Sequence, residues 1–302
     1  MKLEERIKNL YVPGHKVDVV LDSDAYNEID DQFAIAYLLK SKDKLDTKAI
    51  YAAPFHNSKS NGPADGMIKS YDEIIKLLKL AKEDVPVFKG SETYLLDENT
   101  PVISDAAKDL AERAENYSPE NPLYVVAIGA ITNVASAILL NPKMIENTVV
   151  VWLGGHALHH ENTREFNMFQ DIAAARIVMG CGVPFVQLPC TGVVSSFRIS
   201  KPELEYWFMG KNELSDYLAK NTIEEAEAYA SGKPWTRCIW DVVAVAWLLN
   251  DDDHFMKSKI IPAQLPTYNY FYSNESKGNY IRYIYDIKRD NLWKDVIDKI
   301  TK

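Results

Sequence analysis

The chain has 302 residues, of which 47% are hydrophobic and 25% are charged, a composition that is ordinary for a globular protein. This length is sufficient for one large domain. No low-complexity stretch or break in composition divides the chain, so we expect a single domain over residues 1–302. The formal net charge of −9 argues against nucleic acid as a partner, because a phosphate backbone requires a basic surface.

The cysteines and the first residues indicate a cellular compartment. Cys181, Cys190 and Cys238 have neither zinc-finger nor redox-pair spacing, so we expect reduced thiols. The N-terminus lacks the apolar core of a signal peptide, and no apolar run is long enough to cross a membrane. We therefore expect a cytoplasmic protein with no membrane partner.

Strand and helix patterns alternate through most of the chain. Apolar, β-rich runs predict strands at residues 17–21, 49–53, 123–128, 148–153, 184–188 and 280–287. Apolar residues at helical spacing predict helices at 29–39, 67–78, 105–116, 133–140 and 171–179, a mainly helical stretch over 202–250, and a closing helix. Ser104 is placed to cap one helix, and Gly180 is suited to end another. The alternation predicts a single-domain α/β fold, Rossmann-related, with a largely parallel central sheet flanked by helices.

Acidic residues are crowded where the first strand should end and the first long helix should begin. Asp22, Asp24, Glu28, Asp30 and Asp31 together exceed what the positive end of a helix dipole can neutralise. Like carboxylates held this close raise each other's pKa unless a cation lies between them. The cluster therefore indicates a hard divalent cation with oxygen ligands at this junction. The alternative is a solvated acidic cap on an ordinary α/β crossover.

Other polar clusters follow the carboxyl ends of other predicted strands. They are Asn57, the pair Thr132-Asn133, and the loop from Gly154 to Asn167. In a parallel sheet these ends share one rim, so the clusters should meet the acids of residues 24–31 there. Such a convergence is what a small polar ligand requires.

The same clusters resemble the calcium-dependent nucleoside hydrolases, the inosine-uridine preferring nucleoside hydrolase family. The similar segments, in the family's order, are Asp22-Ser23-Asp24 with Asp30-Asp31, residues 128–135, Leu153-Gly154-Gly155 followed by Glu165-Phe166-Asn167 and Asp171, and Asp241 ahead of an apolar helix. They span residues 18–246. The resemblance implies hydrolysis of the N-glycosidic bond of ribonucleosides, which yields ribose and free base.

The resemblance also implies a role for particular residues. Ca²⁺ would be bound by the side chains of Asp24, Asp31 and Asp241 and by the backbone carbonyl of Thr132. Asp24 would also be the general base that takes a proton from a metal-bound water. The substrate would be held by Asp30 and Asn167 at ribose hydroxyls, by Glu165 at the 5′ end of the sugar, and by Asn57. We also expect a homo-oligomer, either a dimer or a tetramer.

Two departures from the family concern the turn and the leaving group. Five residues separate Asp24 from Asp30, where most relatives have three, and the usual Gly is absent. Trp240 stands before Asp241, where many pyrimidine-specific or broadly specific members carry a His that protonates the departing base. Tryptophan cannot donate that proton usefully, but it can stack on a purine. Purine leaving groups are therefore favoured over pyrimidines.

Competing interpretations exist for the residues and for the protein. Asp241 and Thr132 could be helix caps, Glu165 and Asn167 could belong to a solvated loop, and Trp240 could pack in the core. The whole chain could be a nucleoside- or ribose-binding protein without turnover. A haloacid-dehalogenase-type phosphatase is a further alternative, because Asp22-Ser23-Asp24 after a strand is similar to its nucleophile motif.

Overall fold

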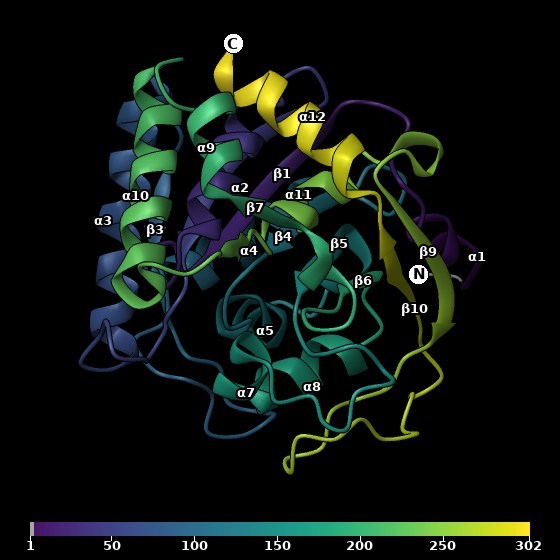
Figure 1. The fold of residues 1–302 in the computed structure, drawn as a ribbon. Coiled ribbons are helices and arrows are strands. Elements are labelled where there is room, and N and C mark those ends of the chain that lie inside the picture. The colour runs from purple at the N-terminus through teal and green to yellow at the C-terminus, as the bar shows by residue number, and fades with distance from the viewer. Residues whose placement is uncertain (1–2) are drawn as a thin grey trace.

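The structure, a computed structural model, describes residues 3–302 and is built around one twisted sheet of eight strands (Figure 1). The strands are β1 (Val17–Ser23), β2 (Leu45–Ala52), β3 (Val87–Lys89), β4 (Leu123–Ala127), β5 (Thr148–Leu153), β6 (Phe185–Leu188), β9 (Met256–Pro262) and β10 (Tyr280–Ile287). Their order is β3-β2-β1-β4-β5-β6-β10-β9. All neighbours are parallel except the edge pair β10 and β9. This arrangement confirms the predicted α/β class.

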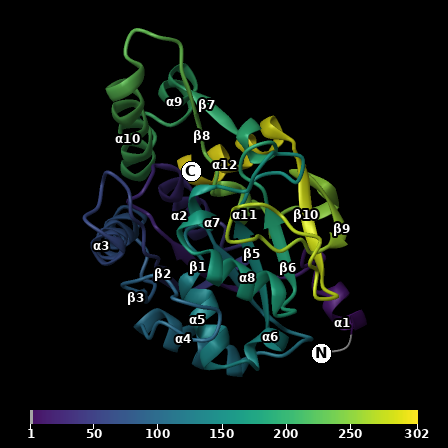
Figure 2. The same ribbon diagram turned by 90° about the horizontal axis from the view of Figure 1, so that it is seen from below.

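Helices cover both faces of the sheet, and each face has its own hydrophobic cluster (Figure 2). One face carries α2 (Asp30–Leu39), α3 (Pro63–Ala81), α9 (Lys201–Trp207), α10 (Glu213–Ala230), α11 (Val242–Trp247) and α12 (Arg289–Thr301). The other carries α4 (Asp105–Arg113), α5 (Thr132–Leu140), α6 (Met144–Asn147) and α8 (Ile172–Gly180). Two further short helices are α1 (Leu3–Lys8) and α7 (Phe166–Gln170).

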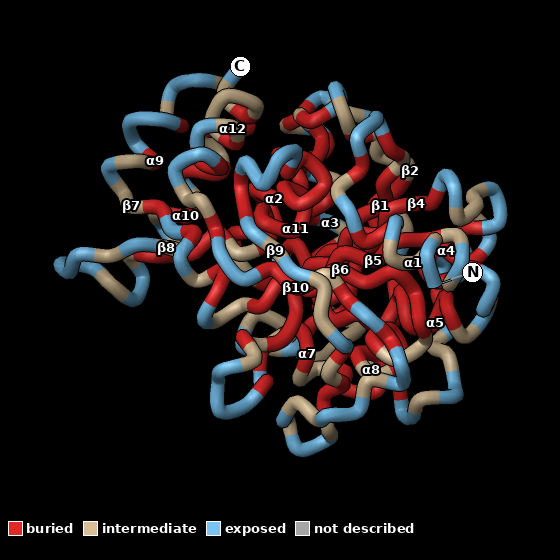
Figure 3. The backbone as a smooth tube through the Cα atoms, turned by 90° about the vertical axis from the view of Figure 1, so that its right-hand side faces the viewer, coloured by how far each residue is buried: buried red, intermediate tan, exposed pale blue. Residues whose placement is uncertain are grey.

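Successive residues of the central strands point to opposite clusters. In β1, Val19 and Leu21 belong to the first cluster and Val20 belongs to the second, as the two-residue period of a strand requires. Both faces are therefore buried, which explains why the central strands are almost continuously apolar. Figure 3 shows these strands buried along their length. Among the described residues, no helix is both long enough and apolar enough to span a membrane.

The structure adds elements that the periodicity did not predict. These are the short helices α1, α6 and α7, the edge strands β3 and β9, and a separate antiparallel pair, β7 (Arg198–Ser200) with β8 (Thr236–Cys238). The prediction that Gly180 lies just after the end of its helix, at the C′ position, was wrong, because Gly180 is the last residue of α8. Gly182 instead has the left-handed φ of +94°. The cap at Ser104 is confirmed, since its side chain accepts a hydrogen bond from the Ala107 amide.

The connectivity places a crevice beside the end of β1. The strand order β3-β2-β1-β4-β5-β6 reverses direction between β1 and β4, and such a switch point is where doubly wound sheets bind ligands. The helix after β1, α2, lies on one face, while the helix after β4, α5, lies on the other. The segments that follow β1 and β4 therefore diverge, and the space between them can hold side chains from both.

Candidate functional site

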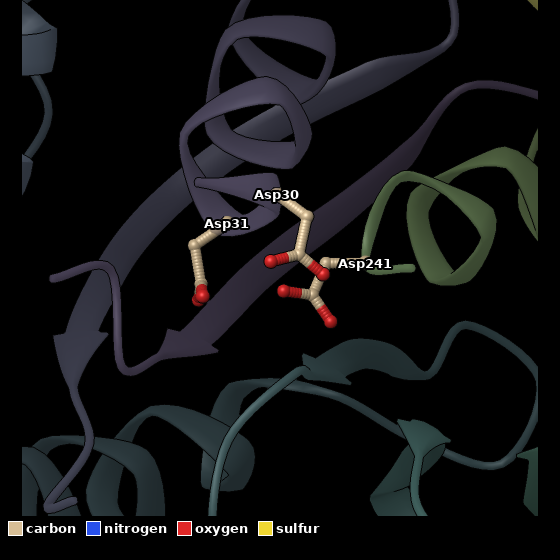
Figure 4. A group of neighbouring side chains, drawn as sticks. All are labelled: Asp30, Asp31 and Asp241. Carbon is tan, nitrogen blue, oxygen red and sulfur yellow. The ribbon is translucent and has the colours of Figure 1, made fainter. Parts of the chain in front are cut away.

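Three buried carboxylates converge at the carboxyl end of β1. Asp30 and Asp31 open α2, and Asp241 directly precedes α11. One oxygen from each of these side chains lies within 4.8 Å of the other two. Figure 4 shows them directed into one space between the first turns of the two helices. The structure thus brings together residues that lie far apart in the sequence.

Asp24 lies close to this group, and its charge is not compensated by the protein. Both carboxylate oxygens of Asp24 are buried, and neither has a hydrogen-bond partner among the described residues. Burial raises the pKa of Asp24 well above its ordinary value, and the negative charges of Asp31 and Asp30 raise it further. An unpaired buried carboxylate is strongly unfavourable, so these orphaned oxygens fit a bound cation.

The pKa values of the neighbouring carboxyls rise for the same reasons. Burial raises the pKa of Asp31 to about 7, although Ser23 Oγ donates to Asp31 Oδ1 at 2.6 Å. For Asp241, burial raises the pKa most, followed by the charges of Asp30, Asp31 and Asp24. A divalent cation among these oxygens would reverse both effects, because it favours the ionised form. The donor set therefore fits a hard metal ion.

Asp22 supports the site from below and does not line it. Asn133 Nδ2 donates to Asp22 Oδ1 at 2.8 Å, and Asn133 Oδ1 accepts from the amide and the hydroxyl of Ser91. Gly129 is needed nearby, because a Cβ at this position would lie 2.9 Å from Asp24 Oδ1. The end of β4 can therefore approach Asp24 only with glycine there.

Thr132 is not brought to the cavity. It is the first residue of α5, and its hydroxyl donates to Asp171 Oδ2 at 2.7 Å. From the same segment, Ile128 lines the cavity, and its carbonyl accepts from Asn167 Nδ2 at 3.0 Å. Ile128 lines the cavity and Thr132 does not, because the chain turns between them to start α5 on the other face of the sheet.

Glu165 and Asn167 are held firmly by backbone groups. The Glu165 carboxylate accepts from the amides of Gly155, Asn167 and Met168 at 2.9, 2.9 and 3.0 Å. Burial nevertheless raises its pKa to about 7. Asn167 Nδ2 also donates to the Leu153 carbonyl at 3.1 Å. The side-chain amide of Asn167 thus bridges the ends of β4 and β5 at the cavity wall.

A cavity of about 280 Å³ lies above these groups. Most of the predicted site residues line it: Asp30, Asp31, Asn57, Glu165, Asn167, Trp240 and Asp241. Asp24 and Thr132 are not among the lining residues. The sequence analysis did not assign Asn27, Glu28, Ile128, Leu153, His156, Arg164, Phe166 and Cys190, which also line the cavity. Several of these residues belong to the long turn after β1 or to the polar loop after β5. The sequence analysis placed these two segments at the site but did not assign the individual side chains.

The long turn after β1 is held by contacts of its own. The Asn27 amide donates to the Asp24 carbonyl at 2.7 Å, and Asn27 Oδ1 accepts from Asn57 Nδ2 at 2.6 Å. Glu28 pairs with Arg237 at 3.1 Å. The additional residues therefore form part of the cavity wall, and they connect the turn to the loop after β2 and to β8.

Fold and site together define an α/β protein with an acid-lined cavity at the switch point of its sheet, an arrangement typical of enzymes that act on small polar molecules. The family model "Inosine-uridine preferring nucleoside hydrolase" matches residues 19–294. The chain belongs to this family, whose members hydrolyse the N-glycosidic bond of ribonucleosides, and it is an N-ribohydrolase. The phosphatase alternative is thereby set aside.

Individual relatives agree with this assignment. The pyrimidine-specific ribonucleoside hydrolase RihA of Salmonella arizonae is 26% identical over 258 residues, which are 76% of this chain and 79% of RihA. Among solved structures, a plant nucleoside hydrolase, PpNRh1, has a TM-score of 0.74 and 19% identity over 94% of this chain and 99% of that one. An inosine-guanosine nucleoside hydrolase has a TM-score of 0.73 and 19% identity over 94% of this chain and 98% of that one. These structures share the fold.

Proposed function

We propose that the protein is a Ca²⁺-dependent ribonucleoside hydrolase that favours purine nucleosides and releases ribose and free base. The observation that carries the proposal is the buried carboxylate group of Asp24, Asp30, Asp31 and Asp241, in which Asp24 has no partner among the described residues. Protein atoms alone leave this concentration of negative charge unbalanced. A hard cation and the hydroxyls of a ribose would balance it.

Asp24, Asp31 and Asp241 would hold the ion through their carboxylates. For the carbonyl ligand that the family implies, Thr132 is the residue expected from the sequence, but Ile128 is the residue of this segment that lines the cavity. We therefore assign the carbonyl role to Ile128. When bound, Ca²⁺ supplies a Lewis acid that lowers the pKa of a coordinated water.

Asp24 would act as the general base. A bound cation would keep its buried carboxylate ionised, and this carboxylate would accept the proton of the attacking water as the C1′–N bond breaks. Asp30 and Asn167 would orient the ribose hydroxyls, and Glu165 would lie at the 5′ end. The negative side chains around the sugar stabilise the oxocarbenium-like charge that develops at C1′.

Trp240 would form the surface on which the base lies. It is half-buried, packs against the first hydrophobic cluster and lines the cavity next to Asp241. An indole offers stacking area and cannot act as a proton donor in the way that histidine does. A purine gains more from this surface than a pyrimidine, and its protonation would come from solvent.

The test is hydrolysis of inosine, guanosine and uridine by the purified protein, with and without a chelator. The release of free base measures the rate. We expect cleavage that depends on Ca²⁺, with inosine or guanosine preferred. A protein that binds these nucleosides stoichiometrically without releasing base over many hours would instead be a binding protein, and the proposal would be wrong.

A further inference from the structure

One cationic side chain lines a cavity that is otherwise acidic. Arg164 precedes Glu165 in the loop after β5, and it is the one Arg or Lys among the described residues that line the cavity. Five carboxylates, those of Glu28, Asp30, Asp31, Glu165 and Asp241, belong to the same lining. Within the described part of the chain, Arg164 forms an ion pair with none of them, since no carboxylate oxygen lies within 4.0 Å of its guanidinium.

The guanidinium of Arg164 is held by aromatic rings. Its central carbon lies 5.5 Å from the ring centre of Phe169 and 5.5 Å from that of Tyr270. The backbone beneath it is fixed as well, because the Arg164 amide donates to Asn162 Oδ1 at 3.0 Å and the Thr163 amide donates to the Tyr270 carbonyl at 2.7 Å. Aromatic faces orient a guanidinium and leave its N–H edges available.

His156 adds a second polar group without a partner on this wall. It follows Gly155 at the end of β5 and lines the cavity. Its ring nitrogen Nδ1 is buried and has no hydrogen-bond partner among the residues described. Burial and the neighbouring His160 lower the pKa of His156, which favours the neutral ring, and a neutral imidazole can donate or accept a hydrogen bond.

The position of Arg164 relates it to one end of the substrate. In the function proposed above, on which this inference rests, Glu165 lies at the 5′ end of the ribose. The Glu165 carboxylate is already committed to its backbone amide donors. Arg164 is the adjacent residue and presents N–H donors in a planar fork, which matches the oxygens of a phosphate group.

We propose that this wall is a subsite for an anionic group on the 5′ carbon of the ribose, and that the substrate class includes nucleoside 5′-monophosphates. Arg164 binds the phosphate oxygens and His156 completes the pocket. In the reaction, the oxygen of water adds to C1′, and the C1′–N bond breaks with its electron pair leaving on the base. One proton of the water passes to Asp24, and the departing base takes up a proton from solvent. The products are ribose 5-phosphate and free base, and the phosphate ester is unchanged.

The direct test is the binding of ribose 5-phosphate and of ribose to the Ca²⁺-loaded protein, measured by calorimetry. We expect ribose 5-phosphate to bind about tenfold more tightly, as one charge-assisted contact at an exposed site provides. Arg164→Gln should abolish the difference and Arg164→Lys should keep part of it. A matched control is Arg198→Gln on β7, where the guanidinium bonds to Thr236, and it should leave the ratio unchanged.

Further measurements distinguish a 5′-phosphate subsite from a surface anion site. They also test the subsite separately from the proposed hydrolase function. Inorganic phosphate should compete with ribose 5-phosphate, whereas phosphate that binds Arg164 without competing would show a surface anion site and overturn the proposal. Equal affinity for ribose and its 5-phosphate, or a ratio of affinities that is unchanged in Arg164→Gln, would also overturn it.

If the subsite is correct, the ratio of kcat/KM for inosine 5′-monophosphate to that for inosine should fall about tenfold in Arg164→Gln. Cleavage of inosine without any preference for ribose 5-phosphate would remove the subsite alone. A preference for ribose 5-phosphate over ribose, without cleavage of inosine, would contradict the hydrolase mechanism alone.

Discussion

At the residue scale, Asp24 is distinguished among the described residues because both of its carboxylate oxygens are fully buried and neither has a hydrogen-bond partner. Asp24→Asn keeps the shape of the side chain but removes the proton acceptor and weakens a metal ligand. We expect the fold to persist and the rate of inosine hydrolysis to fall by about 10²–10⁴, the usual range for a lost general base. Steady-state kinetics and a circular dichroism spectrum check this.

Asp46→Asn is the matched control for that variant. Asp46 lies in β2 near its beginning, away from the acid cluster, and its carboxylate pairs with Lys48 at 2.6 Å. Its removal should change the rate little. An Asp24→Asn protein that keeps more than about a tenth of the wild-type rate would show that another group is the base.

Trp240 carries the prediction about the base. Trp240→Ala should lower kcat/KM for inosine more than for uridine, because a purine loses more stacking, and stacking on an aromatic side chain is worth about 1–3 kcal/mol per base. Trp240→His should shift the preference toward uridine by supplying a proton donor. Trp235→Ala is the control, since Trp235 also packs partly buried against the first cluster but does not line the cavity. If Trp240→Ala lowers both rates equally, Trp240 acts through stability alone.

The residues of the site could be predicted from the sequence to different extents. Asp24, Asp30 and Asp31 were predicted because a crowding of acids after a strand indicates a bound cation, whereas Asp241 was assigned only through the resemblance to the family. Ile128, His156 and Arg164 were not found, because nothing in their local sequence shows which way the chain turns after a strand. The backbone carbonyl in particular was expected at Thr132, and the start of α5 carries this residue away from the cavity.

At the element scale, the turn between β1 and α2 departs most from the family pattern, and its contacts suggest why it is tolerated. Arg237 in β8 pairs with Glu28 at 3.1 Å and with Glu225 in α10 at 3.2 Å. The same cation lowers the pKa of Asp30, against the larger effect of burial that raises it. The turn after β1, which lines the cavity, is thus connected to α10 and β8 through one side chain.

Arg237→Gln should therefore weaken substrate binding more than it slows the chemical step. Because Glu28 is about half-exposed, its ion pair is worth about 1 kcal/mol or less, so we expect KM for inosine to rise several-fold while kcat changes little. The kinetic constants of this variant and of Arg198→Gln on the neighbouring strand β7 provide the comparison. A loss confined to kcat would mean that the turn positions the base Asp24 instead.

Most central elements were predictable because their sequence period is strong, and the exceptions are short or lie at edges. β3 has only three residues, and β9 pairs on one side only, so neither has the long apolar run of a central strand. β9 also carries Lys257 and Lys259, as exposed edge strands commonly do. The antiparallel direction of β9 depends on the chain that returns after it, and no local pattern records that.

At the scale of the whole molecule, the buried carboxyls make stability depend on pH and on the ion together. Burial raises the pKa of Asp22, Asp31 and Glu165 to about 7. In the unfolded chain these groups lose their protons near pH 4, so between about pH 4 and about pH 7 the folded state holds more protons. The free energy of unfolding of the ion-free protein should therefore fall as the pH rises through this range.

Thermal unfolding in a chelator should show a midpoint several degrees lower at about pH 8 than at about pH 5. Ca²⁺ should raise the midpoint at both pH values, and more at the higher one, because the ion binds ionised carboxylates. Calcium titration should reach one equivalent per chain. A midpoint that is unaffected by Ca²⁺ at about pH 8 would contradict the metal site.

The acid cluster also has a consequence for the synthesis of the protein. Its members come from the first strand-helix unit and from the residue before α11, so they lie far apart in the chain. During translation, Asp24, Asp30 and Asp31 leave the ribosome long before Asp241 does. A nascent chain therefore has an incomplete ion site for most of its elongation and gains the last carboxylate only when α11 emerges. Uptake of the ion would then coincide with the docking of α11 against α2, and a chain truncated before Asp241 would lack one ligand of the ion.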